Sequence, residues 1–375
     1  MMTTFENLNL FIFAAATFVW LLRARRLSYT QRLTPVINPD KIIRNGDLVS
    51  VVLPAKNEEK NIRECIERLQ AQQYLNVEII AVNDNSKDET ENILRSMGAA
   101  YVNAPFTPEG WTGKNFAIHT GMQKARGEWL LFTDADTRHE PSSIAASLAH
   151  MKENGLEFLT LLPRCITGTW LEDLVQPATM AFLGLWFPME KVNDPASPLF
   201  FANGQYLFIK RSLYEKLGGH EAVKGAFLED FALAKLAKAA KAKTECALGV
   251  SVYGTRMYDS FDSIWKGWRR IYLHAFEKNV PVLVQKAASV FFFSALPFWA
   301  LIALAAKGFH ASLAVYFFCF ACFLLMNIIS WKAYQVVKAK HPAYAFLHPV
   351  AALLATCILI DAVKVAASGG KTVWR

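Results

Sequence analysis

The chain has 375 residues, of which 53% are hydrophobic, and a net charge of +8. That length suits one large domain or two smaller ones, and the apolar content is high for a wholly soluble protein. Much of the positive charge flanks apolar segments, where anionic lipid headgroups attract Lys and Arg, so the charge does not predict nucleic acid as a partner. The six cysteines lack the spacing of metal ligands.

The first element is an apolar stretch at residues 7–22, followed by four arginines: Arg23, Arg25, Arg26 and Arg32. A signal peptide carries its charge before the apolar region, so this order predicts an uncleaved membrane anchor. Three later stretches, at 287–306, 308–331 and 341–360, contain no Asp, Glu, Lys or Arg. Since a transmembrane helix needs about 20 mostly apolar residues, the last quarter of the chain is predicted to form three apolar helical segments.

Cationic residues orient these segments, because Lys and Arg are enriched in cytoplasmic loops. The arginines after residue 22 place the following region in the cytoplasm, and three lysines do the same for the loop at 331–346. A fourth crossing at 343–366 would put Lys371 and Arg375 outside, against the same rule. The last segment is therefore either a fourth crossing or a re-entrant or interfacial helix, and both alternatives remain open.

Residues 48–258 lack a long apolar run and alternate between strand and helix patterns. Short β-branched runs predict the strands, and apolar residues at helical spacing predict the helices between them. In chain order these are a strand at 48–55, a helix at 57–72, a strand at 77–84, a helix at 86–98 and a strand at 128–136. This alternation predicts an α/β fold with a mostly parallel central sheet.

Each of these three strands ends in polar residues, at 54–58, 83–86 and 134–136. Ligands bind beyond the carboxyl ends of parallel strands, so these groups are expected to meet in one crevice. Asp134 and Asp136 would destabilise each other unless a cation or strong donors neutralised them. Mg²⁺ typically binds one or two carboxylates together with substrate phosphates. The pair therefore predicts a metal–diphosphate site, although Asp is also common in solvated turns.

Three stretches together carry a family resemblance: “VSVVLPAKNEEKNI” (49–62), “VEIIAVNDNSKDET” (77–90) and “LLFTDAD” (130–136). In this order and spacing they resemble the nucleotide-binding half of family 2 glycosyltransferases, which have the GT-A fold and use nucleotide-diphospho sugars. Two more stretches, “GWTGKNFAIHTG” (110–121) and “LGGHEAVKGAFLEDFALAKL” (217–236), are similar to the membrane-bound branch that glycosylates lipids. That branch includes hopanoid-associated and carotenoid (diaponeurosporenoate-type) enzymes.

The resemblance implies a donor site. Asp84 would bond the base, Asp134 would reach the ribose or sugar, and Asp136 would bind a Mg²⁺ or Mn²⁺ ion that bridges the diphosphate. Lys114 would meet a phosphate as a point charge, unless it is a solvated loop lysine. Asp84 could equally be a turn residue, and Asn57 a helix cap. The residues that would line the uridine pocket are Pro54, Ala55, Asn57 and Glu58.

On the acceptor side, the resemblance implies that Asp230, with Glu229 second, is the base that takes the acceptor's proton. The plainer alternative is that both acids only complement a helix dipole. Related membrane enzymes carry Gln-x-x-Arg-Trp near residues 263–276. Here there is no Gln, and Trp268 precedes Arg269 and Arg270. Substrate binding by these three residues and an interfacial amphipathic helix both remain open.

The sequence thus predicts an inverting, metal-dependent glycosyltransferase of the inner membrane, with its catalytic domain in the cytoplasm, that moves a sugar from a UDP-sugar to a membrane lipid. The expected parts are an anchor and linker at 1–46, a GT-A domain at 47–260, an interfacial segment at 261–281 and a membrane region at 282–375. Alternatives are a polyprenyl-phosphate glycosyltransferase, a polysaccharide synthase, a nucleotidyltransferase and a non-catalytic membrane scaffold. The sequence names neither the sugar nor the lipid.

Overall fold

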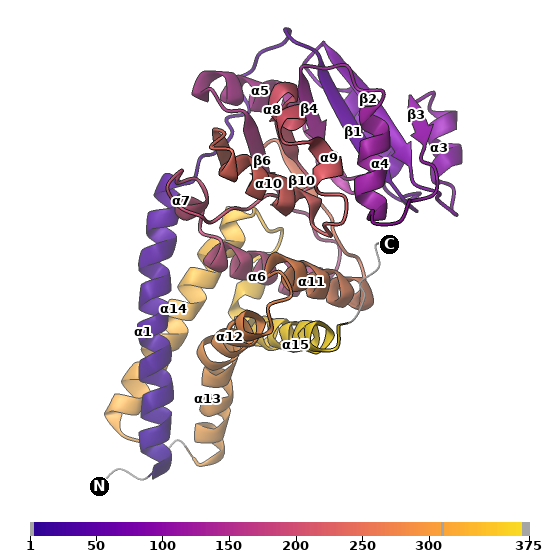
Figure 1. The fold of residues 1–375 in the computed structure, drawn as a ribbon. Helices are drawn as coiled ribbons and strands as arrows, with labels where there is room; N and C mark the ends of the chain where they lie inside the picture. Colours follow the sequence, from indigo (N-terminus) through magenta and orange to yellow (C-terminus); the bar gives the residue numbers. More distant parts are fainter. Residues whose placement is uncertain (1–3, 309–310, 370–375) are drawn as a thin grey trace. The chain divides into compact units, whose positions relative to one another are not determined.

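The computed structural model describes residues 4–308 and 311–369, and Lys371 and Arg375 lie outside them. The chain forms two compact units, which we describe separately (Figure 1). The helical unit contains residues 4–33, 167–186, 258–308 and 311–369, and the sheet unit contains residues 34–166 and 187–257. The expected boundaries after residues 46, 260 and 281 stay a prediction. Residues 167–186, which fall inside the expected catalytic domain, pack in the helical unit.

The sheet unit is built on a seven-stranded sheet in the order β3-β2-β1-β4-β8-β6-β9. The prediction of an α/β fold with a mostly parallel sheet is confirmed, because β1 is parallel to both β2 and β4, and only β8 is antiparallel to its neighbours. All seven residues of β1 are buried, which explains its continuous apolar sequence. The strands are β1 (Val49–Ala55), β2 (Val77–Asn83), β3 (Tyr101–Asn103), β4 (Trp129–Phe132), β6 (Phe158–Leu162), β8 (Leu207–Lys210) and β9 (Thr244–Leu248).

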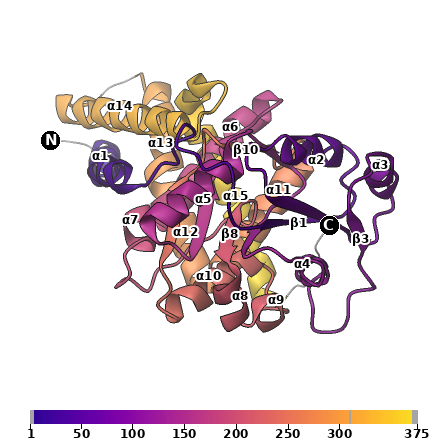
Figure 2. The same ribbon diagram turned by 90° about the horizontal axis from the view of Figure 1, so that it is seen from above.

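Helices cover both faces of this sheet, with α2 and α4 on opposite sides of β1 (Figure 2). A second sheet, in the order β5-β10-β7, joins β5 (Thr137–His139), β10 (Tyr253–Thr255) and β7 (Arg164–Cys165). The helices of the sheet unit are α2 (Ile62–Gln70), α3 (Thr90–Ser96), α4 (Gly113–Met122), α5 (Ser143–Asn154), α7 (Met189–Val192), α8 (Arg211–Lys216), α9 (Gly219–Ala222) and α10 (Glu229–Ala239).

Two helices begin later than the sequence pattern predicts. Asn57 has a φ of 56°, in the left-handed region, and the carbonyl of Glu58 accepts the N–H groups of Asn61 and Ile62. Residues 57–61 therefore form a turn, and α2 starts at Ile62. In the other case, the Asp88 carboxylate accepts the N–H of Thr90 at 3.1 Å, so α3 starts only at Thr90. Both loops lie at the carboxyl ends of strands, where they are free to form a binding site.

The helical unit contains four helical stretches that are long and apolar enough to cross a membrane: 4–33, 280–306, 313–336 and 342–367. Each overlaps one of the four apolar segments that the sequence predicts, and residues 309–310 of the third predicted segment lie outside the described part of the chain. The second begins seven residues early, because the Asn279 side chain caps α12 by accepting the N–H of Val282. The elements are α1 (Thr4–Leu33), α6 (Trp170–Trp186), α11 (Phe261–Ala275), α12 (Val280–Val290), a π-helical turn η1 (Phe291–Ala295), α13 (Leu296–Ala306), α14 (Leu313–Val336), a 3₁₀ turn η2 (Pro342–Leu347) and α15 (His348–Ala367).

Candidate active site

The ends of β1 and β2 are tied together, as the predicted crevice requires. The two strands pair in register up to Ala55 and Asn83, and the N–H of Asp84 donates to the carbonyl of Ala55 at 2.8 Å. Asp84 is 1% exposed, and its carboxylate accepts from Lys56 Nζ at 3.0 Å and from Asn85 Nδ2 at 3.3 Å. These contacts hold the residues predicted for the nucleotide pocket at one edge of the sheet.

Asn57 does not cap α2, whose first helical residue follows Asn61. Its side-chain oxygen instead accepts the N–H of Lys87 at 2.8 Å, and its own N–H donates to Ser86 Oγ at 3.1 Å. Asn57 therefore joins the loop after β1 to the loop after β2. Glu58 lies close enough to Asp136 for its charge to act on that carboxyl.

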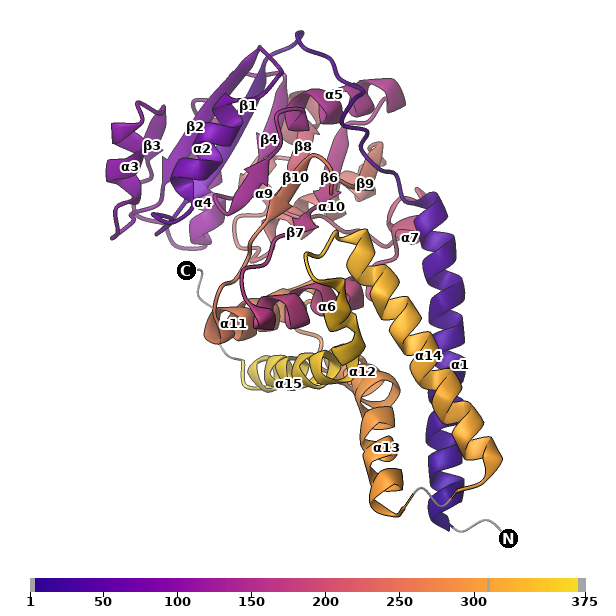
Figure 3. The ribbon, with the colours of Figure 1, turned by 180° about the vertical axis from the view of Figure 1, so that it is seen from behind.

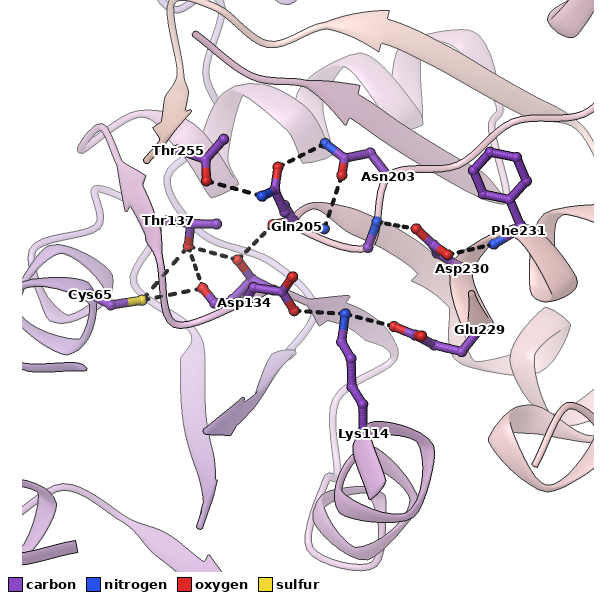
Figure 4. A network of polar contacts seen from close by, with 12 residues as sticks. Cys65, Lys114, Asp134, Thr137, Asn203, Gln205, Glu229, Asp230, Phe231 and Thr255 are labelled. Carbon is purple, nitrogen blue, oxygen red and sulfur yellow. Dashed lines mark hydrogen bonds and ion pairs between the residues drawn. The ribbon is translucent and has the colours of Figure 1, made fainter. Parts of the chain in front are cut away.

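Asp134 and Asp136 lie in the turn that leads from β4 to β5, because β4 ends at Phe132, earlier than the strand predicted at 128–136. A buried network holds this turn: Thr137 Oγ1 donates to the carbonyl of Asp134 at 2.7 Å, and Thr133 Oγ1 donates to the carbonyl of Gln205 at 2.8 Å. His139 Nε2 lies 2.9 Å from Thr133 Oγ1 (Figure 4 shows part of this network). Burial lowers the pKa of His139 to about 3, so this imidazole is neutral and takes no part in proton transfer near neutral pH.

Lys114 joins the two halves of the predicted site. It lies in the first turn of α4, and its Nζ is 2.8 Å from Asp134 Oδ1 and 2.7 Å from Glu229 Oε1 (Figure 4). Burial alone would lower the pKa of Lys114, but Asp134, Glu229 and Asp230 together raise it above its ordinary value. The lysine is therefore a permanent cation between the Asp-x-Asp turn and the acidic pair at the start of α10.

Asp230 is held by backbone donors rather than by a cation. The N–H of Gly204 donates to its Oδ2 at 2.6 Å, and the N–H of Phe231 donates to its Oδ1 at 2.8 Å (Figure 4). Burial, followed by the charge of Glu229, raises the pKa of Asp230 to about 7, against the opposing effect of Lys114. A carboxyl group with that pKa changes protonation state near neutral pH, as a general base requires.

Gly204 lies close against the charged side-chain ends of the site. A Cβ atom at this position would lie 3.1 Å from both Asp230 Oδ2 and Lys114 Nζ, and 3.3 Å from Glu229 Oε1. The neighbouring Gln205 carbonyl accepts the bond from Thr133, so the loop at 203–205 connects the Asp-x-Asp turn to Asp230. This loop was not predicted from the sequence, because Asn-Gly-Gln matches no functional motif.

The carboxylates fit a divalent cation. Oδ1 of Asp136 is buried and accepts no hydrogen bond from the described residues, and burial together with the charges of Asp134 and Glu58 raises the pKa of Asp136 well above its usual range. Among residues 4–308 and 311–369 no three His, Cys, Asp or Glu side chains gather at metal-binding distance. Mg²⁺ sites that share substrate phosphates typically use one or two protein carboxylates, a number that Asp134 and Asp136 can supply.

Trp268, Arg269 and Arg270 lie on α11 of the helical unit, and each has a partner there. Trp268 is 1% exposed and its Nε1 donates to Gln176 Oε1 at 2.7 Å. Arg269 Nη1 donates to Asp361 Oδ2 at 3.0 Å, and Arg270 Nη2 donates to the Tyr258 hydroxyl at 3.4 Å. A role for these residues in substrate binding stays a prediction.

Comparisons with known proteins show which sequences and folds this chain resembles. Residues 50–218 match the family model described as Glycosyl transferase family 2. A 4,4'-diaponeurosporenoate glycosyltransferase from Staphylococcus haemolyticus is 27% identical over 232 residues, which is 59% of this chain and 60% of that protein. The protein of the same name from Staphylococcus aureus (strain USA300) is 28% identical over 243 residues, which is 60% of this chain and 61% of that protein. The match thus spans less than two thirds of these relatives.

A solved structure shares the fold. It is a mannosyltransferase from Pyrobaculum calidifontis in complex with GDP-Man and Mn²⁺, with a TM-score of 0.53 and 19% identity, and the alignment covers 97% of this chain and 100% of that one. At this identity the likeness shows the fold alone. The match of residues 50–218 to the glycosyl transferase family 2 model and the fold shared with this structure agree with the GT-A fold that the sequence predicts.

Proposed function

We propose that the protein is an inverting glycosyltransferase that moves a sugar from a UDP-sugar to a membrane lipid. The observation that carries the proposal is the position of Lys114, 2.8 Å from Asp134 and 2.7 Å from Glu229. One cation links the carboxylate expected on the donor side to the acidic pair expected on the acceptor side. Direct displacement needs both sides within one site, because the attacking and leaving oxygens bind the same carbon.

In the proposed step, an acceptor oxygen attacks the anomeric carbon and forms the new C–O bond. The bond from that carbon to the diphosphate oxygen breaks, and UDP leaves with the electron pair. Asp230 takes the proton of an acceptor hydroxyl, and its pKa of about 7 suits this role near neutral pH. A single displacement inverts the configuration of the anomeric carbon.

The donor would bind at the ends of β1, β2 and β4. Pro54, Ala55, Asn57 and Glu58 line the proposed base pocket together with Asp84, and Asp136 with Asp134 would hold Mg²⁺ or Mn²⁺. The bound cation would act as a Lewis acid on the charge that develops on the leaving diphosphate. Lys114 remains charged throughout and stabilises the same negative charge. Because the solved mannosyltransferase of similar fold holds GDP-Man, GDP-sugars belong in the same test as UDP-sugars.

Two observations support a lipid acceptor: the four apolar helical stretches, and the carotenoid acid in the name of the staphylococcal relatives. A carotenoid, a hopanoid or another lipid of the inner membrane fits this chemistry, with the catalytic domain on the cytoplasmic side. The acceptor group matters for mechanism. A hydroxyl needs the base, whereas a carboxylate has already lost its proton, so Asp230 would be dispensable only for a carboxylate acceptor.

Trp268, Arg269 and Arg270 are proposed to act with the membrane part of the protein, at headgroup depth, where Trp and Arg are commonly found. Trp268 and Arg269 already pair within the helical unit, which favours a structural role over direct contact with the diphosphate. A polymerising synthase would use an intact Gln-x-x-Arg-Trp motif, which this chain lacks. A polyprenyl-phosphate acceptor differs from our proposal only in the lipid.

The test is nucleotide release from detergent-solubilised protein with total lipid extract. UDP-sugars and GDP-mannose are supplied in turn with Mg²⁺ or Mn²⁺, and the native protein is compared with Asp136→Ala, Asp230→Asn and Glu221→Gln. Glu221 is an exposed carboxylate of the same unit and serves as the matched control. We expect lipid-dependent release of the nucleoside diphosphate that Asp136→Ala loses with any acceptor, that Asp230→Asn loses with a hydroxyl acceptor, and that Glu221→Gln keeps.

Other results would contradict the proposal. Release of pyrophosphate would indicate a nucleotidyltransferase. The absence of release with every donor would favour the non-catalytic scaffold. Equal loss in Glu221→Gln would mean that any change of charge disables the protein, and our assignment of the carboxylates would then have no support.

A further inference from the structure

The last apolar helix, α15, runs across the first one. Figures 1 and 3 show α13 antiparallel to α1, α14 packed obliquely along α1, and α15 lying crosswise to α1 within the same helical unit. Helices that cross a bilayer tilt by about 20° on average, and by up to roughly 40°, from the membrane normal. If α1 crosses the bilayer, a crosswise α15 does not, although its length and composition would allow it.

We propose that α15 lies along the membrane surface, in a layer with α6 and α11, and that the described part of the chain crosses the bilayer through α1, α12–α13 and α14. The three helices of this surface layer pack against one another. The proposal does not depend on the enzymatic reaction. It concerns only how the helical unit meets lipid.

The two faces of α15 fit different surroundings. Its buried face is rich in small residues, with Ala351, Ala352, Ala355 and Ala362 among them, which lets neighbouring helices approach closely. The opposite face presents residues at spacings of three and four: Val350, Leu353, Cys357, Ile360 and Lys364. Val350 is 39% and Ile360 is 44% exposed, and the stripe is apolar up to its final lysine. In the proposed placement, acyl chains of the bilayer cover this apolar stripe, and the Lys364 ammonium reaches the headgroups.

Polar contacts set the depth of α15. The Asp361 carboxylate accepts from Trp265 Nε1 at 2.8 Å and from Arg269 Nη1 at 3.0 Å, both on α11. The outer face of α11 carries Asp262 and Lys266, whose side chains are 72% and 63% exposed. Such charges are very costly in hydrocarbon, so α11 lies at the interface. Asp361 holds this part of α15 at the same depth.

Three crossings also agree with the distribution of Lys and Arg along the chain, which a fourth crossing would contradict. With α15 on the surface, Lys364 stays on the same side as the arginines at the end of α1 and the lysines of the loop at 331–346. A fourth crossing would take the residues after α15 to the opposite side. The positive-inside rule therefore agrees with a surface helix.

The first test maps sides with single reporter cysteines and a membrane-impermeant maleimide in sealed vesicles of known orientation. Asn45→Cys reports the linker after α1, Lys307→Cys the turn between α13 and α14, and Ser368→Cys the end of α15; all three positions are exposed. Labelling of the native protein, whose described cysteines are buried or half-buried, gives the background. We expect Ser368→Cys to react on the side of Asn45→Cys. Reaction on the side of Lys307→Cys would overturn the proposal.

The second test separates a surface helix from a re-entrant one, which would return to the same side. Fluorophores at Val350→Cys and Ile360→Cys are quenched by lipids that carry quenchers at graded depths. A surface helix gives the same depth at both positions. A helix along the membrane normal rises 1.5 Å per residue, so ten residues would separate the depths by about 15 Å, and that result would overturn the proposal.

Discussion

The two units differ in how their carboxylates are arranged: they form a cluster in the sheet unit and are bonded individually in the helical unit. In the sheet unit, Asp134, Asp136, Glu229 and Asp230 gather around Lys114, and none of the described residues bonds Oδ1 of Asp136. In the helical unit, Asp361 is bonded to Trp265 and Arg269, while Asp173 accepts from Thr167 Oγ1 at 2.6 Å and lies 3.1 Å from His341 Nδ1. A surplus of like charge destabilises the fold and marks a binding site, whereas matched charges serve packing.

This contrast gives opposite expectations for mutation. Substitutions in the carboxylate cluster should remove activity at little cost in stability. Substitutions of the paired charges should lower stability and leave activity nearly unchanged.

The largest effect is expected for Asp136→Ala. Loss of the proposed cation site removes several kcal/mol of transition-state stabilisation, which corresponds to about 10³-fold or more in rate. Because the pKa of Asp136 is raised, its charged form destabilises the fold near neutral pH. The variant should therefore melt at a higher temperature than the native protein in EDTA. An unchanged rate, or a lower melting temperature, would show that Asp136 is not part of a strained cluster.

Lys114→Met should lower kcat by about 10²-fold, the typical cost of removing one preorganised charge from the reacting centre. Methionine keeps the length of the side chain but leaves Asp134 and Glu229 without their shared cation. Steady-state kinetics with the donor identified by nucleotide release would measure this effect. A change in KM for the donor alone would mean that Lys114 only helps the donor to bind.

The pH dependence of transfer to a hydroxyl acceptor should follow Asp230. A general base works only when unprotonated, and the pKa of Asp230 is raised to about 7. The rate should thus fall about tenfold for each pH unit below that value and level off above it. Transfer that is independent of pH between 5 and 8 would instead indicate a carboxylate acceptor that needs no base.

Gly204→Ala should lower kcat by about tenfold, because the new methyl group displaces flexible side-chain ends and shifts the geometry of the site. The added Cβ would lie 3.1 Å from Asp230 Oδ2 and from Lys114 Nζ. Gly184→Ala is the matched control, since a Cβ there meets nothing within 4 Å. Equal activity of both variants would mean that the loop at 203–205 does not position Asp230.

The smallest effect on activity is expected for Asp361→Asn, which weakens the acceptor of two hydrogen bonds from α11. Bonds to a charged group contribute about 1.5–3 kcal/mol each, and the amide keeps part of that. Unfolding followed by far-UV circular dichroism should show a loss of stability with unchanged kcat in the folded protein. A lost kcat without a lost stability would place Asp361 in the catalytic machinery.

The sheet unit was largely predictable because its signals are local. A buried parallel strand is a short apolar run, and β1, β2 and β4 lie where those runs predict. Asp134 and Asp230 are about a hundred residues apart, and only the resemblance to family 2 linked them. The bridge through Lys114 and Gly204 depends on how α4 and the loop at 203–205 fold, which no local pattern encodes.

In the helical unit, composition predicts which segments are helical but not how the helices are oriented. Hydropathy predicts each apolar helix, but it carries no information on direction, so α14 and α15 look alike in sequence and lie differently in the fold. No element was predicted for residues 170–186, and the assignment of α6 to this unit rests on long-range contacts, such as the bond from the Tyr334 hydroxyl to the Leu174 carbonyl at 2.8 Å.

The most direct test of the central claim is the transfer of labelled sugar to lipid by Asp230→Asn, measured beside donor binding to the same variant. The account predicts that the donor binds with nearly native Kd, that transfer to a hydroxyl lipid falls by about 10²–10⁴-fold, and that the native product has inverted anomeric configuration. Native transfer by Asp230→Asn to a hydroxyl lipid, or a native product with retained configuration, would contradict direct displacement with Asp230 as the base.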